Sequence, residues 1–529
     1  MHNANANTGA YTTLPFGVSH RQYWGSMVEC DDTSSLDSAA RQLEEYLNVN
    51  LENELILKFP LPIISASLDT LDTLMCKVCQ KLQLYYRSIT SGCESKSFLV
   101  RRASDSFNEL RVAVTGNVDA GKSTMLGVLT HCTLDDGRGK ARTGLFRHKH
   151  ELESGRTSSI GQEILGFEID GKIVERTKKV SSEDICKQSF KLITFLDLAG
   201  HEKYLKTTMF GLAGCSPDYV MMMVGANAGM IGMAKEHLFL AFALNVPVFC
   251  VITKIDMCPA DILSTTQAQL FKILKSSSCK RVPLVIKSEE DVLFAVTHFS
   301  DRICPIFLVS NVVGTNIDLL KIFLNLLPVQ GKYMKGEEFE FPVTEIYSVP
   351  GVGTVVAGTV THGWTQTNQN VLLGPDFQGN FTKVQIKSTH RKRLPAIKAA
   401  AGQCASFALK KIKKASIRKG MMLLSTSYDF SVGNVCIEFE AEVLVLFHST
   451  TISPKYQAMI HCGAVRQAAT IVDLFSKERL RTGDRALVRF KFLKFPEFMK
   501  LGSRLLFREG RTKGVGKITK LIPLKTKTQ

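Results

Sequence analysis

The segment Gly116–Ser123 constrains the fold more than any other part of this chain. It has the form G-x-x-x-x-G-K-S and lies between the apolar run Arg111–Thr115 and a helical pattern over Thr124–Thr130. A strand that leads into a glycine-rich loop and then a helix turns successive backbone N–H groups towards a polyphosphate. We therefore predict a phosphate-binding loop in which Lys122 reaches the outer phosphates and Ser123 ligates Mg²⁺.

Around this loop, apolar strands alternate with helical patterns from residue 108 to about residue 330. This alternation is typical of a doubly wound α/β domain with a mostly parallel sheet. Ligands of such domains bind beyond the carboxyl ends of the strands, so polar motifs at those ends should meet. The predicted strands are Arg111–Thr115, Leu192–Asp197, Tyr219–Val224, Val248–Thr253 and Ile306–Val309.

A short polar motif, Asp197-Leu-Ala-Gly200, closes the second predicted strand. The Asp197 carboxylate can hold Mg²⁺ through water, and the Gly200 N–H can meet a γ-phosphate. His201 follows directly, at the place where a group that orients the attacking water belongs. A lone histidine is more often an ordinary hydrogen-bonded residue, but its position next to Gly200 favours the catalytic interpretation.

Two further motifs select the base. Thr253-Lys-Ile-Asp256 ends one predicted strand, and Ser310-Asn311 follows another. The Asp256 carboxylate can accept two N–H bonds from guanine, and adenine offers no matching pair of donors. The Lys254 stem can lie over the base, while the backbone N–H groups of Ser310 and Asn311 face the guanine oxygen. The sequence therefore predicts a site for GTP or GDP with Mg²⁺.

The remainder of the chain predicts three other regions. Residues 340–425 and 434–522 contain short β-branched runs separated by Gly, Pro or Asn, a pattern typical of two β-barrel domains. Residues 523–529 form a basic tail. Residues 1–107 are expected to be a small α+β region, partly disordered.

Within residues 1–107 the sequence predicts an amphipathic helix over Ser35–Leu47, one strand and a second helix. The strand covers Leu55–Phe59, and apolar residues recur at helical spacing over Leu68–Tyr86. The helical segment contains Cys76 and Cys79, which form a C-x-x-C pair. Because no second pair at zinc-site spacing accompanies them, buried thiols are the favoured interpretation.

The net charge and the cysteine content limit which partners and which cellular compartment suit this protein. The net charge of +17 favours polyanionic partners, nucleic acid first, although a generally basic surface is the alternative. The 14 cysteines have no regular spacing, which favours reduced thiols and a cytoplasmic protein. The start of the chain lacks the pattern of a secretory signal, and polar residues interrupt the longest apolar runs. We therefore expect no membrane partner.

These motifs resemble the translational GTPases of the elongation factor Tu class. The resemblance rests on Gly116–Thr124, with Asp119 in the loop, and on Asp197–His201. It extends to Gly155-Arg156-Thr157, similar to the first switch of that class, and to the barrel segments Val343–Gly363 and Arg508–Thr512. It implies that Thr157 ligates Mg²⁺ in the GTP state. The loop residues expected to bind nucleotide are Gly116, Asn117, Val118, Asp119, Ala120, Gly121, Lys122, Ser123 and Thr124.

Longer segments resemble one branch of that class, the GTP-binding protein 1 and 2 family. The segments that carry this similarity are Leu145–Glu151, Glu153–Ser159, Asp197–Lys206, Thr253–Pro259 and Phe507–Gly510. Two residues depart from the elongation factor pattern. Thr253 stands where most GTPases have Asn in the base-recognition motif. Arg156 replaces an apolar residue, so a hydrophobic gate with Val118 is in doubt; Arg156 either approaches the phosphates or faces solvent or RNA.

The resemblance implies a switch GTPase in which Lys122, Thr157 and His201 carry hydrolysis. In the resembled class the second and third domains hold aminoacyl-tRNA, so we expect tRNA or ribosomal RNA on the basic barrels and the ribosome as a partner. One alternative is a GTP-dependent RNA-binding adaptor for mRNA turnover, linked to the exosome. Another is a regulatory GTPase that binds only proteins. The basic runs are Arg391–Arg393, Lys410-Lys411, Lys413-Lys414, Arg418-Lys419, Arg508, Arg511, Lys513 and Lys517.

Overall fold

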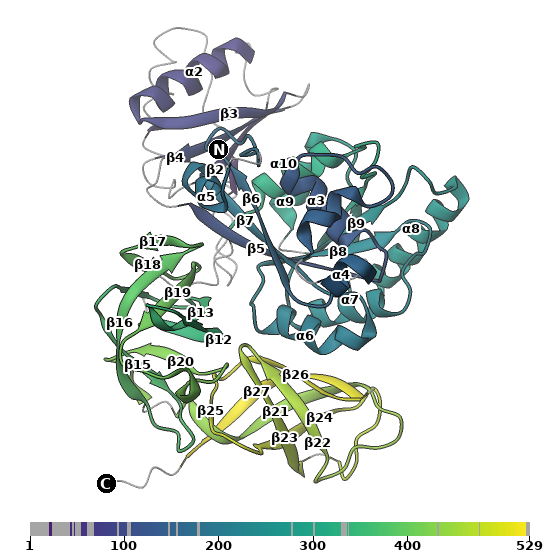
Figure 1. Cartoon of the computed structure of the whole chain (residues 1–529). Helices are drawn as coiled ribbons and strands as arrows, with labels where there is room; N and C mark the ends of the chain where they lie inside the picture. The colour runs from purple at the N-terminus through teal and green to yellow at the C-terminus, as the bar shows by residue number, and fades with distance from the viewer. Residues whose placement is uncertain are drawn as a thin grey trace, which may run out of the picture.

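The computed structural model shows an α/β domain with a small N-terminal sheet above it and two β-barrels below (Figure 1). No helix among the described residues is long and apolar enough to cross a membrane. The cysteines placed by the structure are all free thiols. The structure describes residues 21–23, 43–44, 47, 54–60, 68–91, 95–102, 107–146, 149–154, 157–176, 180–276, 279–299, 302–329, 336, 338–430, 433–475, 477–510 and 512–524.

The N-terminal sheet has four strands in the order β1-β2-β4-β3 and is covered by helix α2. The predicted strand Leu55–Phe59 lies within β2. The helix predicted over Leu68–Tyr86 is wrong beyond Lys81, because Gln83 adopts a left-handed φ of 54° and the chain then pairs with β4. The predicted helix Ser35–Leu47 lies outside the described residues except for 43–44 and 47. The partial disorder predicted for this region concerns stretches outside the described residues. The elements are β1 Arg21–Tyr23, β2 Glu54–Pro60, α2 Leu68–Lys81, β3 Leu84–Ser91 and β4 Ser95–Arg102.

The α/β domain contains a seven-stranded sheet in the order β10-β11-β9-β8-β5-β7-β6. All neighbours are parallel except β6 and β7, which form an antiparallel pair. The five predicted strands are present, and β11 is shifted towards the N-terminus of its predicted range, whereas β6 and β10 were missed. The strands are β5 Asn108–Gly116, β6 Gly161–Phe167, β7 Lys191–Asp197, β8 Tyr219–Gly225, β9 Val248–Thr253, β10 Val282–Val285 and β11 Ile303–Leu308.

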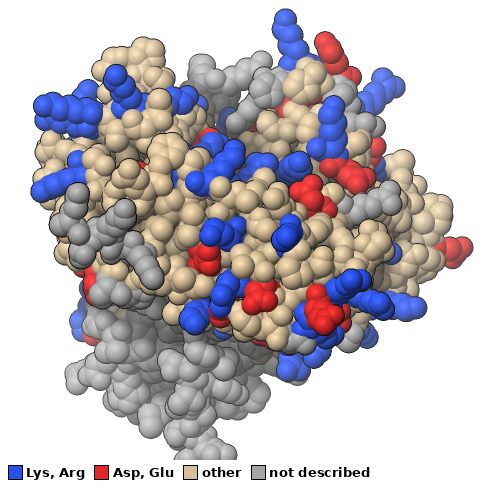
Figure 2. All heavy atoms as spheres, turned by 90° about the horizontal axis from the view of Figure 1, so that it is seen from below, with Lys and Arg blue, Asp and Glu red and all other residues tan. Residues whose placement is uncertain are grey.

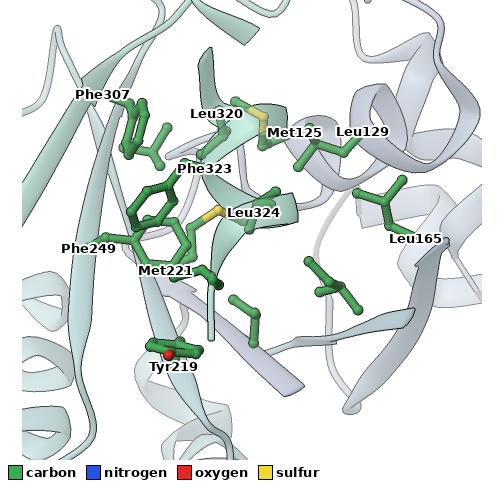
Figure 3. Close-up of a cluster of buried hydrophobic side chains, with 14 of the residues drawn as sticks. Met125, Leu129, Leu165, Tyr219, Met221, Phe249, Phe307, Leu320, Phe323 and Leu324 are labelled. Atoms are coloured by element: carbon green, nitrogen blue, oxygen red, sulfur yellow. The ribbon is translucent and has the colours of Figure 1, made fainter. Parts of the chain in front are cut away.

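Helices cover both faces of this sheet and bury two hydrophobic layers. Helices α3, α9 and α10 pack on one face, where Phe249 and Phe323 meet at 5.1 Å between ring centroids (Figure 3). Helices α6, α7 and α8 pack on the other. The helices are α3 Lys122–His131, η2 Lys140–Leu145, α4 Lys149–Ser154, α5 Ser182–Gln188, η3 Glu202–Tyr204, α6 Leu205–Ala213, α7 Met233–Ala243, α8 Ala260–Lys275, α9 Glu289–His298 and α10 Ile317–Leu326.

The second domain is a closed six-stranded barrel, as the sequence predicted. Its strands follow the order β15-β20-β12-β13-β19-β16, and pairing between β15 and β16 closes the ring. A ribbon of β14 and β18 and the short β17 extend it. The elements are β12 Glu340–Val349, β13 Gly353–Thr359, β14 Trp364–Gln366, β15 Asn370–Gly374, β16 Thr382–Arg391, β17 Leu394–Ala396, β18 Lys398–Ala400, β19 Cys404–Leu409, η4 Lys414–Ser416 and β20 Met422–Ser425.

The third domain is also a closed six-stranded barrel. Its order is β24-β23-β22-β26-β27-β21, and β21 pairs with β24 to close it. The last strand runs one residue into the predicted basic tail, as far as Pro523. The strands are β21 Val435–Phe447, β22 Gln457–Cys462, β23 Val465–Leu474, β24 Arg485–Phe492, β25 Glu497–Phe498, β26 Arg504–Glu509 and β27 Thr512–Pro523.

Each barrel contacts the α/β domain through charged groups. In the second domain, Lys392 pairs with the buried Glu109 of β5 at 3.1 Å. In the third, Arg508 and Lys513 both reach Glu236 of α7, at 3.0 and 3.2 Å. Opposite charges that are shielded from water interact more strongly than exposed ones, so these pairs stabilise the observed docking of the barrels.

A buried charge cluster also ties the N-terminal sheet to the α/β domain. Glu54 of β2 accepts from Lys191 Nζ at 2.7 Å and from Arg101 Nε at 2.9 Å. Arg101 also donates to the Asn325 side chain at 2.7 Å. Burial lowers the pKa of Lys191 to about 8, against the opposing attraction of Glu54. Burial alone would raise the pKa of Glu54, but Lys191 and Arg101 together lower it.

We expect Glu54→Gln to loosen the N-terminal sheet. The substitution leaves two buried cations without a counter-charge, and breaking a buried pair in this way costs about 3–5 kcal/mol. Amide hydrogen exchange of β2 and β4 in the full chain should therefore show a lower free energy of opening. The matched control is Asp318→Asn, which breaks the surface pair with Lys321 at an 89% exposed carboxylate. It should change exchange by less than about 1 kcal/mol. Equal effects of both variants would contradict the structural role of Glu54.

Candidate guanine-nucleotide site

The predicted phosphate loop joins the end of β5 to the start of α3. Gly116 has a φ of 147°, and a Cβ there would lie 2.4 Å from the Met223 carbonyl oxygen. Gly121 has a φ of 77° and caps α3. Neither position accepts a side chain without strain or collision. Both glycines of the sequence motif therefore occupy positions where the backbone requires glycine.

Lys122 is buried at the mouth of this loop, with 7% of its surface exposed. Its Nζ donates to the Asn117 carbonyl oxygen at 2.6 Å and to that of Gly116 at 3.4 Å. Burial lowers the pKa of Lys122, and attraction from Asp197 and Asp119 only partly offsets this. An anion held in the loop would supply the counter-charge that this ammonium group requires.

The three residues predicted to hold Mg²⁺ lie together. Ser123 Oγ donates to Asp197 Oδ2 at 2.8 Å, Thr157 Oγ1 donates to the same oxygen at 3.2 Å, and the two hydroxyls are 3.0 Å apart. The other carboxylate oxygen, Asp197 Oδ1, is buried and has no hydrogen-bond partner among the described residues. Burial raises the pKa of Asp197 despite the nearby Lys122. Hard oxygen ligands around a buried carboxylate fit a divalent cation such as Mg²⁺.

Gly200 and His201 follow this cluster closely. A Cβ on Gly200 would lie 2.5 Å from Lys122 Nζ and 2.7 Å from the Gly116 carbonyl oxygen, so the chain passes directly over the loop. His201 caps the short helix η3, where its Nδ1 accepts the Lys203 N–H at 3.1 Å. Because Nδ1 accepts, the neutral ring carries its proton on Nε2.

A hollow over the loop brings the phosphate-side residues together and adds one that sequence reasoning missed. The addition is Arg142 of η2, which comes after the Asp135-Asp-Gly-Arg-Gly139 turn. The only sequence signal for this turn is its Asp-Gly dipeptide and the second glycine, residue types that favour turns. The lining residues are Val118, Asp119, Gly121, Lys122, Ser123, Thr124, Arg142, Thr157, Gly200 and His201.

The residues predicted to read the base lie at the ends of β9 and β11. Asp256 accepts a hydrogen bond from Ser310 Oγ at 2.6 Å. The same hydroxyl accepts the Val313 N–H at 3.0 Å, so the serine fixes the carboxylate to its loop. Lys254 follows β9 with a φ of 63°. Asn311 is buried, and its Oδ1 has no partner among the residues placed here.

Thr253, the first residue of the base-recognition motif, is bonded to the phosphate loop. It is fully buried, and its hydroxyl donates to the Ala120 carbonyl oxygen at 3.0 Å and towards that of Val224 at 3.4 Å. Its side chain therefore holds the phosphate loop against β9. The other unusual residue of the sequence analysis, Arg156, lies outside the described residues, as does Gly155.

Comparisons with known proteins identify the class to which this fold belongs. The family described as "Elongation factor Tu GTP binding domain" matches residues 108–329. Translation elongation factor SelB from Methanococcus maripaludis, in complex with the GTP analogue GppNHp, shares the fold with a TM-score of 0.55 and 19% identity. That alignment covers 79% of this chain and 81% of the SelB chain. Fold and site thus define an elongation factor Tu-like GTPase with two β-barrels.

Sequence relatives narrow the class. GTP-binding protein 1 of Xenopus laevis is 53% identical over 466 residues, which cover 87% of this chain and 71% of that protein. Human GTP-binding protein 2 is 47% identical over 430 residues, which cover 80% of this chain and 71% of that protein. The chain belongs to the GTP-binding protein 1/2 family.

We expect Gly200→Ala to weaken GTP binding about tenfold to a hundredfold, because the new methyl group collides with Lys122 Nζ and the loop backbone. Titration with a fluorescent GTP analogue measures the effect. The matched control is Gly144→Ala in η2, where the nearest atom to a new Cβ is His131 Cε1 at 4.0 Å. Unchanged affinity in Gly200→Ala would show that the loop tolerates a side chain above Lys122.

Proposed function

We propose that this protein binds GTP with Mg²⁺ and hydrolyses it as a switch that controls binding of aminoacyl-tRNA and the ribosome. The observation that carries the hydrolytic part is the convergence of Ser123, Thr157 and Asp197 beside Lys122. These groups come from three separate segments and meet where the phosphate loop would place the outer phosphates of a nucleotide.

Phosphoryl transfer depends mostly on positioning and charge stabilisation, and the site offers both. Lys122 and the loop N–H groups hold the β- and γ-phosphate oxygens. Ser123 and Thr157 would hold Mg²⁺ through their hydroxyl oxygens, and the buried Asp197 carboxylate would supply negative charge beside it. When bound, Mg²⁺ neutralises charge that develops on the phosphate oxygens. The Gly200 N–H contacts the γ-phosphate, which makes the Asp197–His201 segment sensitive to its loss.

His201 orients the attacking water in this mechanism. Its Nδ1 is occupied by the Lys203 N–H, so Nε2–H is the group available to donate to the water oxygen. A donating Nε2 positions the water without removing its proton at the start of the reaction. The geometry therefore favours an orienting role over that of a general base.

Guanine selectivity is assigned to Asp256, whose carboxylate accepts the two N–H donors on one edge of the base. Ser310 holds that carboxylate through a 2.6 Å hydrogen bond, and the backbone of Ser310 and Asn311 faces the guanine oxygen. Lys254 covers the base with its aliphatic stem. Thr253 contributes through the phosphate loop, to which its hydroxyl is bonded.

The switch reaches the third domain through α6, which follows the Asp197–His201 segment. Arg508 lies near Met209 of α6 and pairs with Glu236 of α7. Leu506 completes the hydrophobic layer under these helices. A change in the segment on hydrolysis would alter this contact, and we propose that the docking of the barrel changes with it.

Two lines support RNA as the ligand of the barrels. SelB, which shares the fold, is by name a translation elongation factor. In addition, an open hollow of about 680 Å³ in the second domain is lined by Lys387, Lys410, Lys411 and Lys413. Among the described residues, no carboxylate pairs with these four lysines, so their charge is directed to solvent. Phosphate groups of RNA are matching counter-ions.

Several of the other basic residues named from the sequence pair with carboxylates of the chain itself. Arg418 pairs with Glu497 at 2.6 Å and Lys419 with Glu345 at 2.7 Å, as Lys392, Arg508 and Lys513 also pair. Figure 2 shows the lower face of the molecule. Lys and Arg side chains (blue) gather towards the left with few Asp and Glu side chains (red) among them, and the two kinds alternate towards the right. We therefore propose that the RNA-binding surface lies on the second domain. We also propose that the protein acts in the cytoplasm. The relatives give no support to an RNA-decay partner.

His201→Ala should slow hydrolysis of bound GTP by about a hundredfold or more, because the water loses its orienting donor. Affinity for GTP should remain nearly unchanged, since the phosphate and base contacts persist. Single-turnover hydrolysis, started from the preformed complex with GTP, separates these two effects. Glu202→Ala, an exposed neighbour in η3 that does not line the hollow, is the control. An unchanged single-turnover rate in His201→Ala would remove the assigned role.

The double variant Lys410→Ala, Lys413→Ala should weaken binding of aminoacyl-tRNA to the GTP-bound protein. Each lost phosphate contact lowers the slope of log affinity against log salt by about one, so the slope should fall by about two. The control Lys477→Ala, Lys491→Ala removes the same charge from lysines that pair with Asp484 and Glu438. If both double variants lose affinity equally, net charge rather than the hollow accounts for binding.

A further inference from the structure

The turn between α3 and η2 is built around one buried carboxylate. Asp135 accepts the N–H groups of Gly137 and Gly139 at 3.1 Å each, and that of Ala141 at 2.9 Å. The side chain is 8% exposed. Three backbone bonds to one carboxylate fix the path of the turn, as in an extended Asx turn.

Contacts at both ends hold this turn against the nucleotide site. The Asp135 N–H donates to the carbonyl oxygen of Asn311, in the predicted base loop, at 2.9 Å. At the other end η2 lies on α3 so closely that a Cβ on Gly127 would stand 2.0 Å from the Ala141 carbonyl oxygen. The turn is thus part of the rigid frame of the site.

This frame presents one side chain to the phosphate hollow. Arg142 lines the hollow with Lys122, Ser123 and Thr157, whereas Arg138 and Lys140 of the same turn are exposed and lie outside its lining. The base-reading residues also lie outside that lining, so Arg142 is at the phosphate end. Lys122 and Arg142 are the two cationic side chains among the lining residues, opposite a single carboxylate, Asp119.

We propose that Arg142 is a second phosphate-binding residue of the nucleotide site, supplied by the Asp135–Ala141 turn rather than by the phosphate loop or the switch segments. This inference rests on the proposed GTP site. A guanidinium can donate two parallel N–H bonds to phosphate oxygens, which an ammonium group cannot do. Because the turn is tied to α3 and to the base loop, Arg142 contacts the nucleotide in both the GTP and the GDP state.

The first test substitutes Arg142 in the full chain and measures the dissociation constants of fluorescent GTP and GDP analogues. Arg142→Ala should raise both constants about tenfold to a hundredfold, the effect of a lost charge-assisted hydrogen bond. Arg142→Lys should fall between this variant and the wild type, because the charge remains without the fork. The control Arg138→Ala removes the same charge from the same turn and should change either constant by less than about twofold.

A second pair of variants leaves the arginine in place. Gly139→Ala introduces a Cβ that would lie 2.6 Å from Arg142 Nε, at a φ of 91°. Gly137→Ala imposes similar backbone strain at a φ of 82°, but its nearest neighbour is Val312 Cγ2 at 4.0 Å. If Arg142 binds phosphate, Gly139→Ala weakens both nucleotides more than Gly137→Ala does.

The outcomes separate the two proposals. Failure of the wild-type chain to bind GTP or GDP would overturn the proposed function itself. Normal wild-type binding with unchanged constants in a folded Arg142→Ala would overturn only the role of Arg142. If Arg142→Ala does not fold, the two glycine variants decide, and equal affinities of Gly139→Ala and Gly137→Ala would overturn the role.

Discussion

The hydrogen bonds that Ser123 and Thr157 donate to Asp197 are the interaction around which the molecule is organised. They join helix α3, the segment after α4 and the end of β7 at one buried carboxylate. A buried carboxylate is costly unless hydrogen bonds or a cation stabilise its charge. The positions of these three segments therefore depend on what stabilises the charge of Asp197, and we propose that this dependence is the physical basis of the switch.

The domains contact the elements next to that carboxylate. Strand β7 ends at Asp197 and begins at Lys191, which pairs with Glu54 of the N-terminal sheet. Helix α6 starts shortly after Asp197 and packs towards the third domain. In the second domain, Lys392 pairs with Glu109 of β5, the strand next to β7. In the proposed switch, a displacement of Asp197 would therefore be one strand or one helix away from every other domain.

The sequence predicted what depends on local chemistry. The phosphate loop, the Asp197–His201 segment and the two barrels follow from glycine positions, strand ends and turn residues. The sequence did not predict the packing between segments that lie far apart in the chain. The periodicity that continued past Lys81 belongs to a strand, because a left-handed Gln83 breaks the helix. Thr253 bonds the phosphate loop, and Arg142 enters the site through a turn whose position depends on Asp135. Both depend on contacts between distant segments.

Basic composition is the clearest case in which sequence and structure give different information. Runs such as Arg418-Lys419 read as RNA contacts in the sequence, yet Glu497 and Glu345 neutralise them in the fold. A paired cation loses its carboxylate when it meets a phosphate, so part of the gain is cancelled. Lys410 and Lys413 would break no ion pair on binding a phosphate, because neither pairs with a carboxylate among the described residues and no acidic residue lines their hollow. If the protein binds RNA as we propose, its affinity should depend on the cations that have no carboxylate partner after folding, and the net charge overstates their number.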